Sequence, residues 1–84
     1  MISIERKAKI KWNCRRGMLE LDLILQPFIA QHLENLSLSQ IKALEQLLEF
    51  SDPELYAVLL ENAQVNDMEL DEIVKLVRQP HHNR

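Results

Sequence analysis

The sequence has little glycine and little cysteine, and it has no long apolar run. Its 84 residues include one glycine, Gly17, and one cysteine, Cys14. A single cysteine excludes an internal disulfide and is typical of a protein in a reducing compartment. No run approaches the roughly 20 apolar residues of a membrane-spanning helix, and no apolar signal core follows the basic N-terminus. We therefore expect a cytoplasmic protein that does not insert into a membrane.

Arrangements of residues that catalyse reactions or bind metals are also scarce. With one glycine, the chain cannot form a glycine-rich loop around a phosphate or a dinucleotide. No Ser-His-Asp set is evident, and the adjacent His81 and His82 lack the spacing of metal ligands on a fixed scaffold. The acidic pair Asp71-Glu72 is expected on a solvated helix face. We infer that the chain is not an enzyme and holds no metal.

The charge is distributed unevenly along the chain. Residues 1–16 hold six basic side chains and one acidic side chain, a net charge of +5, whereas the rest hold four basic and twelve acidic ones. The second part therefore carries −8, and the whole chain −3. A basic N-terminal segment is compatible with nucleic acid, but the acidic remainder would repel phosphates. The pattern favours an acidic protein partner, and we expect no nucleic-acid binding.

Apolar residues recur at helical spacing along the whole chain, without strand alternation, an internal repeat or a low-complexity linker. The pattern predicts an all-α fold, a small bundle of five short helices in a single domain over residues 1–84. The expected helices lie at about residues 3–15, 18–34 and 38–50, with a fourth that opens at Asp52-Pro53 and a fifth that opens at Asn66-Asp67.

Two of these helices have recognisable start signals. Ser37 and Gln40 can form a capping box, in which the serine is the N-cap and the glutamine stands at the third helical position. Asp52 is expected as the N-cap of the fourth helix, with Pro53 at its first helical position.

Four other residues carry structural predictions. Pro27 lies inside the second helix, where we expect a kink, and two shorter helices are the alternative. Trp12 is expected to anchor the first helix to the core, and Cys14 to be a small buried core residue. Pro80 is expected to end the fifth helix, which leaves a short polar tail at about residues 80–84.

The lone glycine stands between two charged segments. Gly17 can adopt positive φ at no steric cost and is expected just past the end of the first helix. Arg15 and Arg16 would then lie in the last turn of that helix, and Glu20 in the first turn of the next. This is a complete structural explanation. A second interpretation adds a docking role, because the bare backbone of a glycine lets a partner protein approach closely. If the helix instead runs through Gly17, Arg16 and Glu20 form an i, i+4 pair.

Here the sequence resembles a known family. Residues 7–22, K-A-K-I-K-W-N-C-R-R-G-M-L-E-L-D, are similar to the N-terminal signature of the FAD assembly factor (SdhE-like) family. The hallmark R-G-x-x-E is present as Arg16-Gly17-Met18-Leu19-Glu20, within the more specific run W-x-C-R-R-G-M-x-E-L-D. The resemblance continues through Pro27-Phe28, Leu47-Leu48-Glu49 and Asp52-Pro53-Glu54-Leu55, and it ends near Leu76-Val77-Arg78.

The resemblance implies a function. Such a factor promotes covalent attachment of FAD to a histidine of its client, the flavoprotein subunit of succinate dehydrogenase or fumarate reductase, by binding that client. The family hallmark implies that Arg16, Gly17 and Glu20 contact the client. Secondary candidates, because they lie next to these residues, are Arg15, Met18 and Asp22. The client carries the FAD, and we expect this chain to bind none tightly.

Two alternatives from other functional classes remain. Some members of this family have been labelled antitoxins of toxin–antitoxin pairs, although such proteins often carry a disordered or DNA-binding segment. Short paired helices also build general protein-interaction modules that bind peptides.

Overall fold

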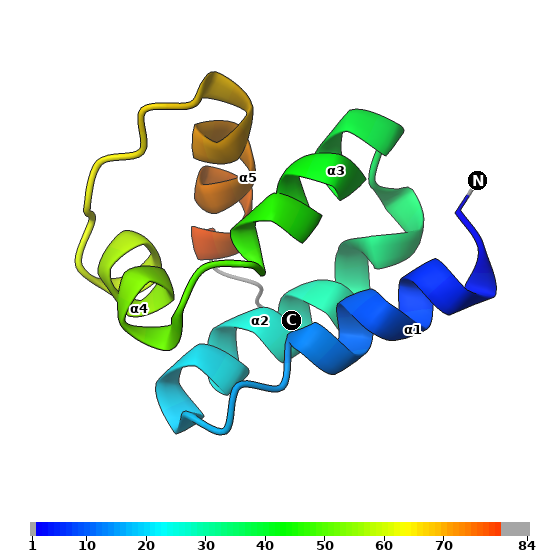
Figure 1. The fold of residues 1–84 in the computed structure, drawn as a ribbon, viewed down its shortest axis with the longest axis horizontal. Coiled ribbons are helices and arrows are strands. Elements are labelled where there is room, and N and C mark those ends of the chain that lie inside the picture. Colours follow the sequence, from blue (N-terminus) through cyan, green and yellow to red (C-terminus); the bar gives the residue numbers. More distant parts are fainter. Residues whose placement is uncertain (1, 80–84) are drawn as a thin grey trace.

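The chain folds into five α-helices, as its helical periodicity indicates. The computed structural model describes residues 2–79 (Figure 1). No strand occurs in this part of the chain, so the prediction of an all-α bundle of five short helices is confirmed. A single 3-10 turn, η1, follows the second helix directly. The elements are α1 (Ile4–Asn13), α2 (Leu19–His32), η1 (Leu33–Asn35), α3 (Leu38–Leu47), α4 (Asp52–Leu60) and α5 (Met68–Arg78).

Side-chain caps begin most of the helices. Ser37 and Gln40 form the predicted capping box at the start of α3, and Asp67 caps α5 by accepting a hydrogen bond from the Leu70 amide. The prediction for α4 was wrong by one residue, because Ser51 is its N-cap and Asp52 already lies in the helix. Ser51 and Glu54 satisfy each other's backbone amides in a capping box, which uses two side chains where Asp52 alone would use one.

Several helices end earlier than their apolar patterns suggested. The first helix was expected to reach residue 15 but ends at Asn13, and the third was expected to reach residue 50 but ends at Leu47. The second gives way to η1 after His32. Pro27 lies inside an unbroken α2, so the alternative of two shorter helices was wrong. Helix ends are set by local capping and loop geometry rather than by apolar periodicity.

The core is formed by α2 and the three helices that follow it, together with Ile10 of α1 and its C-cap Cys14. In it, α3 packs against α5, while α2 contacts both α4 and α5. No polar or charged residue is buried in the described part of the chain. Removing such apolar side chains from water stabilises the fold by about 1.5–3 kcal/mol each. The fully buried large side chains include Leu21, Leu25, Phe28, Leu44, Leu47, Leu55 and Ile73.

The face of α1 that points inward differs from the prediction. Trp12 was expected to anchor this helix, but it is 72% exposed, and Ile10 and Cys14 are buried instead. Arg6 lies on the same side of α1 as Ile10 and Cys14, and its guanidinium forms two hydrogen bonds of 2.7 Å to Glu45 of α3. Lys7 adds an ion pair of 2.7 Å to Glu34 of η1. The prediction that Cys14 is buried is confirmed.

The polar tail at about residues 80–84, with His81 and His82, lies outside the described residues. Within residues 2–79, no helix is long and apolar enough to cross a membrane.

Candidate functional site

The connection between α1 and α2 is an open turn at Gly17. We call residues 14–22 the Gly17 corner. Gly17 has a φ of +77°, and no atom lies within 4 Å of the position that a Cβ would take. The expected positive φ is present, but Gly17 is not the first residue past the helix, because α1 ends at Asn13 with Cys14 as its C-cap. Arg15 and Arg16 therefore lie beyond the last turn of α1. The glycine shapes the loop instead, and its bare backbone faces open space.

Arg16 points into the molecule from this corner. Its Nε donates to Asp52 Oδ1 of α4 at 2.8 Å. Its Nη1 donates to the carbonyl oxygens of Asn13 at 2.9 Å and of Leu48 at 3.0 Å, and its Nη2 to that of Phe50 at 2.6 Å. Only 14% of its side chain is exposed.

Asp22 holds the other end of the corner. Its carboxylate, in the first turn of α2, accepts a hydrogen bond of 2.9 Å from the Arg16 amide. Its own amide donates to the Met18 carbonyl at 2.9 Å. The loop from Arg16 to Met18 is thus tied at both ends, and Gly17 lies between the ties.

Glu20 is the outward-facing acid of the corner. It is exposed in the first turn of α2, as predicted, where the helix dipole favours a carboxylate. Within residues 2–79 it makes no hydrogen bond or ion pair, and Arg16 pairs with Asp52 rather than with Glu20. Because α1 ends before the glycine, the helical i, i+4 pair of these two residues does not form. Glu20 remains available to a partner.

The predicted site residues fall into two groups. Those that face solvent are Arg15, Gly17 and Glu20, whereas Arg16, Met18 and Asp22 are half-buried. The structure brings all six together in one short loop and the start of α2 because they are close in sequence. Their side chains differ in direction, because those of Arg16 and Asp22 form hydrogen bonds within the chain.

Large apolar side chains beside the corner were not predicted as site residues. Trp12 on α1 is 72% exposed, and Leu19 and Leu23 on α2 are 68% and 64% exposed. The signal was available for the two leucines, because they lie one turn apart and out of phase with the buried stripe through Leu21 and Leu25. For Trp12 no sequence signal decided between the two faces of α1.

The thiol of Cys14 is not a reactive group. Burial raises its pKa to about 12, although the positive charge of Arg16 acts in the opposite direction. The thiol therefore stays protonated near neutral pH, and a protonated thiol is a poor nucleophile. Desolvation is the largest effect on this pKa.

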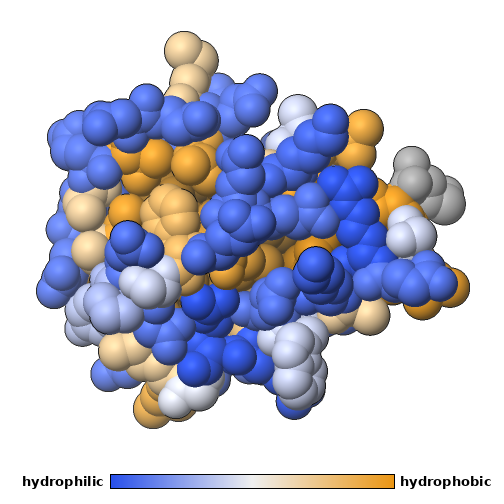
Figure 2. Space-filling view, in the orientation of Figure 1, coloured by the Kyte–Doolittle hydropathy of each residue, from blue (hydrophilic) through white to orange (hydrophobic). Residues whose placement is uncertain are grey.

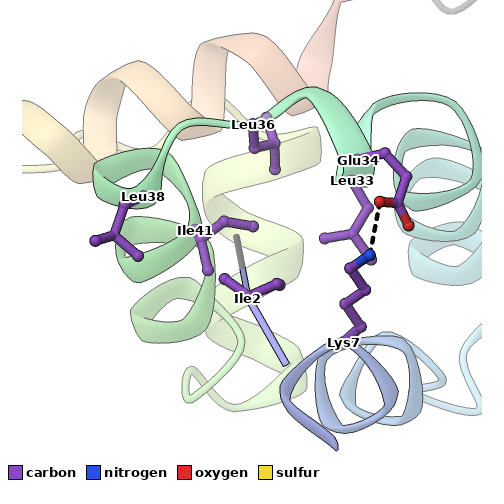
Figure 3. A pocket seen from close by; sticks show the side chains of 7 residues that line it. All are labelled: Ile2, Lys7, Leu33, Glu34, Leu36, Leu38 and Ile41. Atoms are coloured by element: carbon purple, nitrogen blue, oxygen red, sulfur yellow. Dashed lines mark hydrogen bonds and ion pairs between the residues drawn. The ribbon is translucent and has the colours of Figure 1, made fainter. Parts of the chain in front are cut away.

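One hollow of the surface lies beside the corner, and another lies far from it. Met18 lines an open groove with Asp52, Pro53, Tyr56 and Glu61 of the α4 side. A second hollow, of about 320 Å³, lies between the start of α1 and the η1–α3 connection (Figure 3). The Lys7–Glu34 ion pair borders it on one side, and Leu33 and Ile41 are among its apolar lining. None of the six predicted site residues lines this second hollow.

The part of the surface that the structure describes offers no metal site, and the face seen in Figure 2 is mostly polar. Within residues 2–79, no three His, Cys, Asp or Glu side chains lie close enough to hold a metal ion. Figure 2 shows one face on which hydrophilic side chains cover most of the molecule and hydrophobic atoms gather over the α4–α5 side.

Comparison with known proteins gives matches over most of the chain. The sequence pattern of a family described as "Flavinator of succinate dehydrogenase" matches residues 8–81. The "FAD assembly factor SdhE" of Legionella pneumophila (strain Lens) is 49% identical over 72 residues, which are 86% of this chain and 90% of that protein. The protein of the same name from Yersinia pestis is 40% identical over 77 residues, 92% of this chain and 88% of that protein.

Proposed function

The chain belongs to the family of succinate dehydrogenase flavinators, and from this premise we propose that it promotes covalent attachment of FAD to the flavoprotein subunit of succinate dehydrogenase, or of fumarate reductase. It acts by binding that subunit, the client, at the Gly17 corner. The observation that carries the proposal is the pairing of an open glycine turn with an exposed, unpaired Glu20 in the hallmark of the family. The family is one of assembly factors rather than enzymes, in agreement with the lack of a catalytic constellation in the sequence.

The proposed mechanism is positioning. Covalent attachment requires a client histidine to be held against the C8 methyl carbon of the flavin, and such orientation can lower a barrier by several kcal/mol. A factor that binds the attachment-competent arrangement of the client more tightly than other arrangements raises its population. In this proposal Glu20 meets a client donor, and Gly17 lets client backbone approach.

The basic side of the molecule indicates which kind of client surface it would bind. Lys9, Lys11 and Arg15 are exposed on or just after α1, next to the exposed indole of Trp12. An apolar anchor surrounded by cations suits a client patch of acidic residues around an apolar pocket. FAD itself is held by the client in this proposal, because the chain has no glycine-rich dinucleotide loop.

The test compares two glutamates in equivalent helix positions. Glu20 and Glu69 are each the second residue of their helix, α2 and α5, and both are exposed. Each contributes about 0.3–1 kcal/mol to its own helix through the dipole, so Glu69→Ala controls for the helical effect of Glu20→Ala. We expect Glu20→Ala alone to reduce flavinylation of the client.

The measurement is covalent flavin fluorescence of the client on a denaturing gel, with free FAD in excess and circular dichroism as the folding control. If folded Glu20→Ala supports the same flavinylation as Glu69→Ala, Glu20 is only a helix-end residue and the proposed contact is wrong.

A further inference from the structure

We propose that Arg16 is a positioning residue: it joins the ends of four helices and so fixes the Gly17 turn relative to Glu20 in the arrangement that the client needs. The inference rests on the proposed function and deepens it. It assigns the first residue of the R-G-x-x-E hallmark a role inside the factor, whereas Gly17 and Glu20 meet the client.

The hydrogen bonds of Arg16 account for nearly all its donors. An arginine side chain has five N–H groups in a planar fork. Four of the five are used, on Asp52 of α4, on the Asn13 carbonyl at the end of α1, and on the Leu48 and Phe50 carbonyls that follow α3. The backbone amide of the same residue reaches Asp22 of α2. One residue therefore connects four helices.

The acceptors explain why Arg16 stays inside. The last carbonyls of a helix have no partner within that helix, so they need donors from elsewhere. Asn13 and Leu48 are the last residue and the C-cap of α1 and α3, respectively. If Arg16 swung out to a client, three carbonyls and the Asp52 carboxylate would all lose a donor. Direct client binding through this side chain would leave that cost uncompensated.

The position of Arg16 links these bonds to the docking surface. It precedes Gly17 directly, and the hydrogen bond that its backbone amide donates to the Asp22 carboxylate closes a loop over residues 17–21. Glycine lets the turn adopt many conformations, whereas Glu20 lies on the packed helix α2, so the placement of the Gly17 turn relative to Glu20 depends on ties outside the glycine. Arg16 supplies one tie to α2 and the others to α1, α3 and α4.

The test is a set of double-mutant cycles with full-length factor. Arg16→Lys keeps the charge but replaces the planar fork with one ammonium group, which cannot reach all four acceptors. Arg6→Lys is the matched control, because Arg6 also makes a fork, with Glu45, away from the corner. Each variant is titrated into apo client with excess FAD. The half-saturating concentration and the plateau of flavinylation are recorded and corrected for the folded fraction from circular dichroism.

We expect Arg16→Lys to raise the half-saturating concentration by roughly tenfold or more, since small misplacements of a contact cost that much. The plateau should be unchanged, and Arg6→Lys should behave like the parent. Arg16→Lys combined with Glu20→Ala should be no weaker than Glu20→Ala alone, because the placement of the Gly17 turn relative to Glu20 no longer matters once the carboxylate is gone. Asp52→Asn, alone and with Glu20→Ala, should show the same pattern and replaces Arg16→Lys if the latter does not fold.

Three results would overturn the inference. Effects of Arg16→Lys and Glu20→Ala that multiply would mean that Arg16 binds the client itself or acts independently of Glu20. An unchanged half-saturating concentration for folded Arg16→Lys would mean that the corner does not need this fork. A Glu20→Ala variant that is indistinguishable from the parent would refute the proposed docking contact of Glu20. It would also refute the positioning role of Arg16, which depends on that contact.

Discussion

Substitution of Gly17 separates backbone strain from steric blocking of the client. The φ of +77° lies in the left-handed region, where a residue with a Cβ costs about 1–2 kcal/mol. No steric cost adds to this, because nothing lies within 4 Å of the added Cβ. The loss of freedom in the unfolded chain offsets about 0.4–1 kcal/mol. We therefore expect Gly17→Ala to lower the free energy of unfolding by about 1 kcal/mol.

The same argument applies to a large side chain at this position. Since the side chain points into open space, Gly17→Arg should lose about as much stability as Gly17→Ala. For a domain of this size, 1 kcal/mol corresponds to a melting temperature lower by roughly 4–8 °C. Thermal unfolding followed by circular dichroism measures both variants.

The two variants should differ sharply in function. Alanine adds one methyl group to the docking surface, whereas arginine fills the space through which client backbone is proposed to approach. We expect Gly17→Arg to abolish most flavinylation and Gly17→Ala to retain most of it, at temperatures where both are folded. A stability loss above about 3 kcal/mol for Gly17→Ala would refute the open-space argument, since strain alone does not reach it. Equal flavinylation by the two would refute docking at Gly17.

Three further outcomes are expected. Trp12→Ala should change the free energy of unfolding by less than about 0.5 kcal/mol, because the side chain is an exposed surface residue, yet it should weaken flavinylation; a large loss of stability on urea denaturation would contradict the orientation of α1. The pKa of Cys14 is raised from 9.0 to about 12, so on rising pH the unfolded chain loses this proton first, and the contribution of Cys14 to stability falls between about pH 9 and about pH 12. A thiolate-specific reagent at pH 9 should therefore label native protein far more slowly than urea-unfolded protein, and equal rates would refute this. Purified factor should be colourless and should not retain FAD on gel filtration, and stoichiometric flavin without the client would overturn the assignment of FAD to the client.

Local features were predictable because their partners are close in sequence. The capping box of Ser37 and Gln40 and the cap at Asp67 each involve residues three apart. The positive φ of Gly17 follows from a property of one residue. The five helices follow from apolar periodicity, and the six predicted corner residues are neighbours in the chain.

Tertiary packing decided which way these residues face. The α1 sequence offers two apolar stripes, one through Ile4, Ala8 and Trp12 and one through Ile10 and Cys14. Only the second is buried. The choice depends on how α1 meets the rest of the fold, where Arg6 pairs with Glu45, 39 residues away. No periodicity within a ten-residue helix contains that information.

Arg16 illustrates the same limit at the candidate site. Its sequence neighbours suggested an outward donor beside Glu20, but its acceptors on Leu48, Phe50 and Asp52 lie 32, 34 and 36 residues away. Those carbonyls exist in every sequence and have no residue-specific signal. They became partners of Arg16 only when packing brought the α3–α4 turn against the end of α1, and this is why the sequence located the corner while the fold determined which of its charges face solvent.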